Sequence, residues 1–248
     1  MKTRMKFTKG GPLKFIGHLD IMRYFQKAFR RAEIDVEYSK GYSPHQLMSF
    51  AAPLGVGLTS DGEYLDVQLL SSFDRETMID KINEVMAKDI QIVDFRVLPD
   101  NSKNAMSIVA GADYLVSLKD GYDFLSKEEF EKKFKEFMNQ DTIVALKKSK
   151  KTETELDIKP FIYEYSFEPF GEATSTTVAD AYENGIKVYL KLATGSVNNL
   201  KPDLVLEAFC NYVNIPYNEY AFQGHRTEVY ADLGNEGSRK LVPLNQVD

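Results

Sequence analysis

A histidine at the start of a predicted helix is the first candidate for chemistry in this sequence. His18 lies in the segment Gly17–Asp20, where the spacing of apolar residues becomes helical. The first turn of a helix has free backbone N–H groups and a positive potential, which suit an anion. A neutral His18 could act as a general base on a ribose hydroxyl, contact an anionic ligand, or cap the helix. Asp20 fits helix capping better, because the helix dipole favours an acidic residue there.

Two loops rich in turn residues provide a second set of candidates. Gly41–His45 contains Tyr42, Ser43 and His45, and Pro53–Gly57 follows it. Loops dense in glycine and proline follow a defined path and often carry sites on a rigid scaffold. The two N-terminal histidines and a carboxylate could in principle hold zinc, but their spacing matches no metal motif, and nucleophile and phosphate-loop motifs are absent. We therefore expect no metal, no cofactor and no firm catalytic residue, and we treat Tyr42, Ser43 and His45 as binding candidates.

Basic side chains form the third set. The first fifty residues hold ten Lys or Arg against four Asp or Glu, and the remainder holds 21 against 33, so the overall net charge of −6 conceals a cationic N-terminal part. Such an asymmetry points to an anionic partner. The residues expected to contact phosphates or extend the same surface come from many segments: Arg4, Lys6, Arg23, Lys27, Arg30, Lys148, Lys150, Lys151, Lys187, Tyr189, Lys191 and Arg226.

The alternative is that these charges are structural or simply solvated. Lys2, Arg4 and Lys6 alternate with apolar residues and therefore share one strand face. In a split β-α-β sheet the helices cover the other face, so this basic face is expected to be open to nucleic acid. Pairing of Arg4 or Lys6 with Asp66 on a neighbouring strand is the competing interpretation, and a surface pair contributes only ~0–1 kcal/mol. The lysine run at 147–151 is usually a sign of a solvated hairpin tip, and the alternative is a loop that tracks a phosphate backbone.

The elements that position these residues follow a repeated order. Period-2 and helical patterns predict, in turn, a strand at 2–8, a helix at 18–34, an extended piece at 35–39, a strand at 63–69, a helix at 78–86 and a strand at 90–97. A polar linker at 101–104 precedes a second series that contains a capping box, Ser126 with Glu129, and a helix beginning at Pro202. We predict an α+β protein with two tandem ferredoxin-like (βαββαβ) halves and antiparallel sheets, at residues 1–100 and 106–248.

Composition limits the class of protein. An apolar content of 43% is enough for a folded core. The single cysteine, Cys210, excludes an internal disulfide and a multi-cysteine metal site, and it fits a reducing compartment. No apolar stretch approaches the length of a membrane span. These observations predict a soluble, cytoplasmic protein that does not associate with membranes.

Several short segments together resemble a family of uncharacterised bacterial proteins associated with radical-SAM enzymes. In that family the domain is fused behind a cobalamin-binding radical-SAM protein or encoded separately beside one. The segments that carry the resemblance are Phe15–Asp20, Tyr38–His45, Pro53–Gly57, Leu156–Pro160, Gly195–Ser196, Leu200–Pro202 and Arg226–Thr227. The resemblance implies a stand-alone member in a bacterial cytoplasm and supplies no established activity. A radical-SAM cluster is typically held by the cysteines of a CxxxCxxC motif, which this chain lacks.

Three functions are compatible with these observations. The leading hypothesis is a non-catalytic accessory protein that presents structured RNA, such as tRNA or rRNA, to a radical-SAM enzyme acting in trans, with His18 and His45 lining the pocket. A second hypothesis is a metal-independent RNA-processing endonuclease with His18 as general base, because tandem ferredoxin-like halves with a histidine near the first helix also resemble CRISPR repeat-processing endonucleases. A third is a pure protein-interaction module for the radical-SAM partner.

Overall fold

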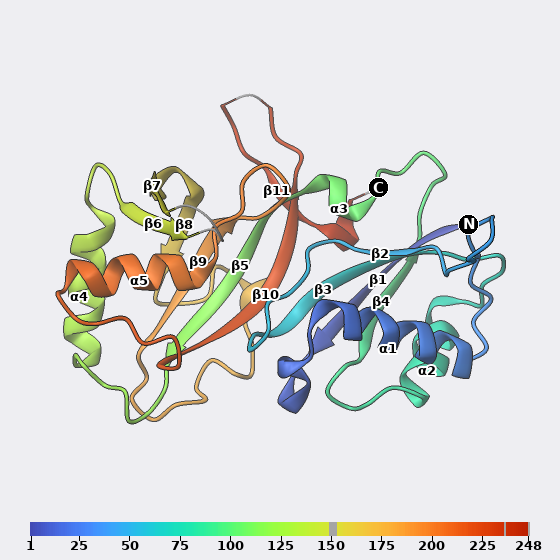
Figure 1. Ribbon diagram of the computed structural model, residues 1–248, viewed down its shortest axis with the longest axis horizontal. Helices are drawn as coiled ribbons and strands as arrows, with labels where there is room; N and C mark the ends of the chain where they lie inside the picture. The colour runs from blue at the N-terminus through green and yellow to red at the C-terminus, as the bar shows by residue number, and fades with distance from the viewer. Residues whose placement is uncertain (149–152, 236, 248) are drawn as a thin grey trace. The chain divides into compact units, whose positions relative to one another are not determined.

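The computed structural model describes residues 1–148, 153–235 and 237–247 (Figure 1). It has the predicted α+β class, and its strands pair mostly antiparallel. The chain forms two compact units, one of Met1–Gly111 with Glu228–Asp248 and one of Ala112–Thr227. The expected division at 1–100 and 106–248 differs from these units, because the C-terminal segment from Glu228 belongs to the first unit. The tandem ferredoxin-like arrangement stays a prediction.

The sheet of the first unit is built around β1 (Lys2–Lys9). β1 pairs antiparallel with β3 (Thr59–Gln68) and with β4 (Ile92–Val97). The short strand β2 (Met48–Phe50) and the long strand β10 (Phe222–Asp232) both pair with β3. The three strands predicted near residues 2–8, 63–69 and 90–97 are therefore confirmed to within a few residues.

Two helices, α1 (His18–Arg31) and α2 (Arg75–Glu84), pack with these strands around one hydrophobic core. α1 buries Phe25 and Phe29 against Met5 and Phe7 of β1, which confirms the predicted helical stripe. Full burial of each such side chain contributes about 1.5–3 kcal/mol. The prediction that the helix continues to residue 34 was wrong: it ends at Arg31, and Glu33 takes a left-handed conformation with φ 54°.

α2 begins earlier than the apolar pattern predicted. Asp74 is its N-cap, and the Asp74 carboxylate accepts a hydrogen bond from the Thr77 N–H at 3.0 Å. An N-cap acceptor satisfies a backbone donor that the helix itself leaves free, so the polar first turn is helical although it contributes little to the core. A short helix, α3 (Ala105–Ile108), directly follows the predicted linker.

The polar face of β1 is covered at Arg4, while Lys2 and Lys6 are partly exposed. Arg4 is 1% exposed, and its Nη1 donates to the carbonyl oxygen of Leu244 at 3.0 Å. Leu244 lies in the C-terminal segment, which contains β11 (Leu241–Pro243), paired antiparallel with β10, and a 3-10 helix, η4 (Leu244–Gln246). At Arg4 the expected free ligand-binding face is instead covered by the C-terminal segment, because alternation along a strand separates two faces without indicating what covers each one.

The second unit contains β5 (Val109–Leu118) from Ala112 onward, β9 (Lys187–Ala193), β8 (Ile162–Ser166) and the part of β10 up to Thr227. β8 and β9 pair antiparallel, and β6 (Val144–Lys148) and β7 (Glu153–Asp157) form a separate hairpin. The helices α4 (Lys127–Met138) and α5 (Pro202–Tyr212) pack through aromatic rings such as Phe134 and Phe209, 5.0 Å apart. The predicted capping box of Ser126 and Glu129 is confirmed.

Candidate nucleic-acid interface

Arg4 is a structural residue. Its Nε and Nη2 donate to the two carboxylate oxygens of Asp66 at 2.8 and 3.2 Å, and both side chains are almost wholly buried. Removing one partner of a buried pair leaves an uncompensated charge in the protein interior. The structure thus agrees with the alternative interpretation of the sequence, in which Arg4 pairs with Asp66. The assignment of Arg4 as a phosphate contact is corrected.

Lys6 is held in a second buried network. Its Nζ lies 2.6 Å from Glu228 Oε2, and the Tyr64 hydroxyl donates to the other oxygen of Glu228 at 2.7 Å. Burial raises the pKa of Glu228, and the positive charge of Lys6 offsets part of that rise. The pKa of Tyr64 is also raised, first by burial and then by the neighbouring Glu228 charge. Lys6 therefore neutralises a carboxylate of its own unit, and its assignment as a phosphate contact stays a prediction.

Four candidates of the second unit are likewise engaged or buried. Lys187 pairs with Asp180 at 2.6 Å, and Lys191 pairs with Glu164 at 2.9 Å. Tyr189, expected between them on a polar face, is fully buried, so burial raises its pKa. Arg226 is only 2% exposed. Tyr189 and Arg226 thus do not serve an exposed surface.

The predicted lysine run at 147–151 lies partly outside the described residues. Lys148 ends β6, while Lys150 and Lys151 lie outside the described residues. The prediction that this run tracks a phosphate backbone stays a prediction.

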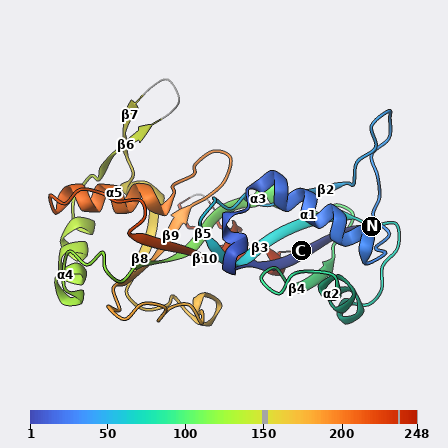
Figure 2. The ribbon, with the colours of Figure 1, turned by 60° about the horizontal axis from the view of Figure 1, so that its bottom comes forward.

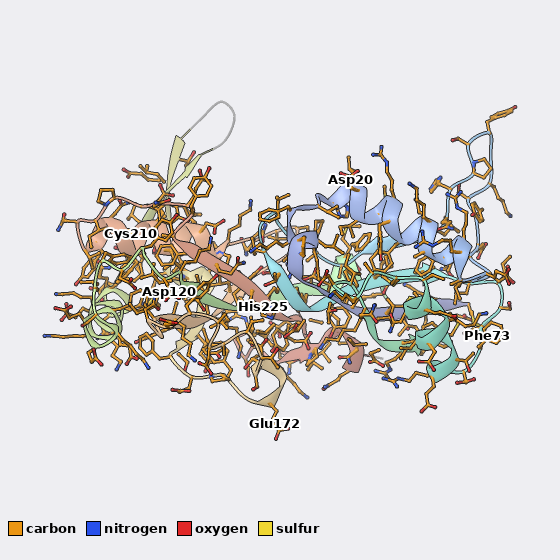
Figure 3. The ribbon with its side chains drawn as sticks, turned by 90° about the horizontal axis from the view of Figure 1, so that it is seen from below. Asp20, Phe73, Asp120, Glu172, Cys210 and His225 are labelled. Carbon is orange, nitrogen blue, oxygen red and sulfur yellow. The ribbon has the colours of Figure 1, made fainter. Side chains whose placement is uncertain are left out.

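The outer side of α1 carries the basic residues that remain solvated. Arg23, Lys27, Arg30 and Arg31 are all exposed. Arg23, Lys27 and Arg30 follow one another at helical spacings of four and three, and Arg31 lies four residues after Lys27. Figure 3 shows the neighbouring Asp20 pointing outward from the same helix. We call these four side chains the basic face of α1.

The basic face of α1 is only weakly neutralised. Arg23 pairs with Asp20 at 3.3 Å, but both side chains are about two-thirds exposed, so the pair contributes ~0–1 kcal/mol. Arg31 donates to the Val85 carbonyl at 2.7 Å, which leaves its charge uncompensated. Within the described part of the chain, Lys27 and Arg30 form no ion pair. The sequence prediction that Arg23, Lys27 and Arg30 lie on one accessible surface is therefore consistent with the structure.

A narrow loop stands beside this helix. Residues 38–46, which we call the finger, project away from the strands of the first unit (Figure 2). Tyr38 and Gln46 form a bridge at its base, and the Ser39 N–H donates to the His45 carbonyl at 2.8 Å. His45 also shares a 2.8 Å side-chain hydrogen bond with Ser39. His45 thus shapes the finger, and Ser43 and Tyr42 lie exposed near its tip.

His18 lies at a different place in the first unit. Its ring packs edge-on against Phe50 with centroids 5.2 Å apart, and it lines a small cavity with Lys9 and Glu63. The cavity, of about 20 Å³, has room for about one water molecule. His45 is not part of its lining. The structure therefore does not bring the two predicted histidines into one pocket.

Lys9 was missed by the analysis of the sequence. It is 3% exposed, and its Nζ donates to the Ile16 carbonyl at 2.9 Å, which ties the start of α1 to β1. A signal was present, because strand alternation puts Lys9 on the face of Met5 and Phe7. A lysine on an apolar face is expected to be buried with partners.

The described residues contain no cluster of at least three His, Cys, Asp or Glu side chains arranged to hold a metal ion. In the same ranges, every helix is too short or too polar to cross a lipid bilayer.

Comparison with known proteins places the chain by sequence. A model of a family described as an uncharacterized protein conserved in bacteria (DUF2344) matches residues 2–202. That range includes α1 and the finger. No curated protein matches the chain.

Proposed function

The chain belongs to this bacterial family, DUF2344, and we propose that it is a non-catalytic accessory protein that binds structured RNA and presents it to a radical-SAM enzyme acting in trans. The observation that carries the RNA-binding part is the basic face of α1. Its four cations lie on one side of a single helix, and Lys27 and Arg30 have no carboxylate partner among the described residues. Phosphates attract such a surface through counterion release, independently of sequence.

The rest of the chain limits how RNA can be held. Arg4, Lys6, Lys187 and Lys191 are satisfied by carboxylates of the protein, so they add little attraction for a polyanion. The overall net charge of −6 opposes indiscriminate binding. A local basic helix on an acidic protein supports recognition of one region of a folded RNA, such as a tRNA or rRNA element, rather than coating of a long strand.

The radical-SAM part of the proposal is supported by the sequence resemblance. The segments Phe15–Asp20 and Tyr38–His45 carry most of it, and they contain the start of α1 and most of the finger. The chain has one cysteine, and Cys210 is buried. Since a CxxxCxxC cluster motif is missing, the reaction would belong to the partner enzyme, with this protein supplying the substrate.

RNA binding over a range of salt concentrations tests the proposal. Lys27→Ala/Arg30→Ala should weaken tRNA or rRNA binding and flatten the log–log salt slope by roughly 1.8 on duplex, or about 1.4 on single strands. The matched control is Lys132→Ala/Lys135→Ala, an exposed pair at the same spacing on α4, which should leave the slope unchanged. RNA binding that ignores salt, or that both double variants weaken equally, would contradict the proposal.

A pull-down with the radical-SAM enzyme tests the second part. We expect co-purification that is strengthened by RNA. Co-purification that persists after nuclease treatment in high salt, together with absence of RNA binding, would instead identify a pure protein-interaction module.

One observation favours an RNA-processing endonuclease as a second candidate. His18 and Lys9 line the same cavity, which is a suitable pairing of a general base and a cation that stabilises a transition state. The cavity, about 20 Å³ in volume, is too small for a ribose phosphate, so the accessory function is better supported. Cleavage of added RNA in the presence of a chelator, with a 2′,3′-cyclic phosphate product and loss of cutting in His18→Ala, would establish the nuclease.

A further inference from the structure

We propose that the finger stacks Tyr42 on an unpaired base, so that the preferred ligand is a folded RNA with an unpaired nucleotide next to a helix. This inference rests on the proposed RNA binding and specifies which RNA is bound. Tyr42 has a relative exposure of 111%, the highest of the large hydrophobic side chains described. Both faces of its ring are solvated, which is the arrangement that stacking on a nucleobase requires.

The finger holds this ring in a defined place. The bridge between Tyr38 and Gln46 and the two hydrogen bonds between His45 and Ser39 close its base. Gly41 has φ 118°, a conformation that side chains rarely adopt, so the tip needs glycine there. A loop with its path already set loses less conformational entropy on binding than a floppy one. The fully exposed Tyr42 is therefore carried by a loop whose conformation is held by its own hydrogen bonds.

The finger is also joined to the basic face of α1. The Gln46 Nε2 donates to the Gln26 carbonyl of α1 at 3.3 Å and to the Tyr38 hydroxyl at 3.2 Å. On the helix surface, the neighbours of Gln26 at i−3 and i+4 are Arg23 and Arg30. Four residues lead from Tyr38 at the base of the finger to Tyr42 at its tip, a reach of at most about 13 Å. The stacking ring and the phosphate-binding cations thus belong to one continuous surface of the first unit.

Cations at both ends of this surface suit nucleic acid, while the segment that links α1 to the finger carries the acidic residues Glu33, Asp35 and Glu37. Lys40 is exposed beside Tyr42 at the tip, and Arg23, Lys27 and Arg30 lie beyond the base. A duplex alone would satisfy the cations but would offer the ring no exposed base face. An RNA that combines a helix with an unpaired base satisfies both, since stacking on aromatic side chains is tolerant of base identity.

Fluorescence anisotropy with two labelled RNAs tests the inference, one a blunt duplex and the other the same duplex with a single-nucleotide bulge. The wild-type protein should bind the bulged RNA about tenfold more tightly, which is a typical contribution from stacking one base. Tyr42→Ala should abolish this preference and keep the salt slope, whereas Tyr42→Phe should retain it. Tyr220→Ala is the matched control, because Tyr220 is an exposed tyrosine of the second unit.

The outcomes separate this inference from the function on which it rests. Salt-dependent binding with equal affinity for both RNAs, or an unaltered preference in Tyr42→Ala, would overturn the stacking role and keep the proposed function. Absence of binding to either RNA would overturn both. Loss of radical-SAM enzyme binding in Tyr42→Ala, with RNA affinities unchanged, would assign the tip to a protein partner instead. Folding of the variants is checked by their unfolding midpoints, which should match the wild type.

Discussion

Arg4 and Asp66 face each other directly across β1 and β3 and form a two-pronged ion pair in the interior of the first unit. The Asp66 carboxylate also accepts a hydrogen bond from the Ala105 N–H at 2.7 Å, and Arg4 donates to the Lys103 carbonyl at 3.1 Å. One pair therefore connects two strands to the segment around α3 and, through Leu244, to the C-terminal segment. The geometry explains why an arginine can occupy a buried strand position.

Breaking this pair should destabilise the protein strongly. Arg4→Met leaves the Asp66 charge buried without its partner, and we expect the free energy of unfolding to fall by about 3–5 kcal/mol. Urea denaturation measures this loss in the free energy of unfolding. The control Arg23→Met, at an exposed position, should change the stability by no more than about 0.5 kcal/mol. An Arg4→Met protein as stable as the wild type but deficient in RNA binding would show that Arg4 contacts RNA after all.

Glu228 should make the stability depend on pH in an unusual direction. Burial raises its pKa above the ordinary 4.5, so in the pH range between the unfolded and folded pKa values the folded state binds more protons than the unfolded state. Stability contributed by this group is then present below pH 4.5 and is lost as the pH rises through the folded pKa.

Comparison with Glu228→Gln isolates this effect, because other carboxylates titrate in both proteins. The stability of the wild type relative to Glu228→Gln should decrease as the pH rises above 4.5. Chemical denaturation at a series of pH values measures the difference. A difference that is constant, or that grows in favour of the wild type, would mean that Lys6 outweighs the burial of Glu228.

Asn245 should anchor the C-terminal segment on the first unit. Its Nδ2 donates to Asp94 at 2.8 Å, and its Oδ1, 3.1 Å from the Tyr64 hydroxyl oxygen, shares the single hydroxyl proton with Glu228. Asn245→Ala removes both bonds, and we expect a loss of about 1–3 kcal/mol in urea denaturation. Asn245→Asp keeps an acceptor for Tyr64 but places a second carboxylate beside Asp94, so it should restore little. An unchanged stability in Asn245→Ala would contradict the anchoring.

Asn245→Ala should also alter the acid sensitivity of the protein. Burial raises the pKa of Asp94, but the hydrogen bonds from Asn245 and Arg75 outweigh it and hold the pKa below 3.8. Stability from this group is present above 3.8 and is lost as the pH falls through the folded pKa. Asn245→Ala should reduce this loss at low pH, which the acid limb of an unfolding profile would detect. An acid limb as steep as that of the wild type would contradict this role of the bond.

A substitution of Tyr189 tests whether this buried residue of the second unit takes part in RNA binding. Its hydroxyl is buried without a hydrogen-bond partner among the described residues. Replacing such a group by an apolar one of the same shape is neutral or stabilising, so Tyr189→Phe should gain up to about 1 kcal/mol and leave RNA affinity unchanged. Thermal or urea unfolding with a parallel RNA titration measures both. A loss of RNA affinity in Tyr189→Phe would restore the predicted surface of β9.

The sequence by itself determined the local elements and one accessible surface. The helical period identified the side of α1 that carries Phe25 and Phe29, and the opposite side was necessarily the basic one. The turn residues of Gly41–His45 indicated a loop, and Ser126 with Glu129 indicated a helix start. Each of these features depends on residues only a few positions apart, which a pattern in the sequence contains.

Only the tertiary structure decided which charged residues are available. The partners of Arg4 are Asp66 and Leu244, which are 62 and 240 positions away in the chain, and those of Lys6 and Tyr64 are similarly distant. The attachment of the finger to Gln26 is likewise a contact between separate elements. Alternation in β1 shows that Arg4 and Met5 point to opposite sides, but the burial of a charge depends on the distant groups that meet it, and that meeting arises only when the chain folds.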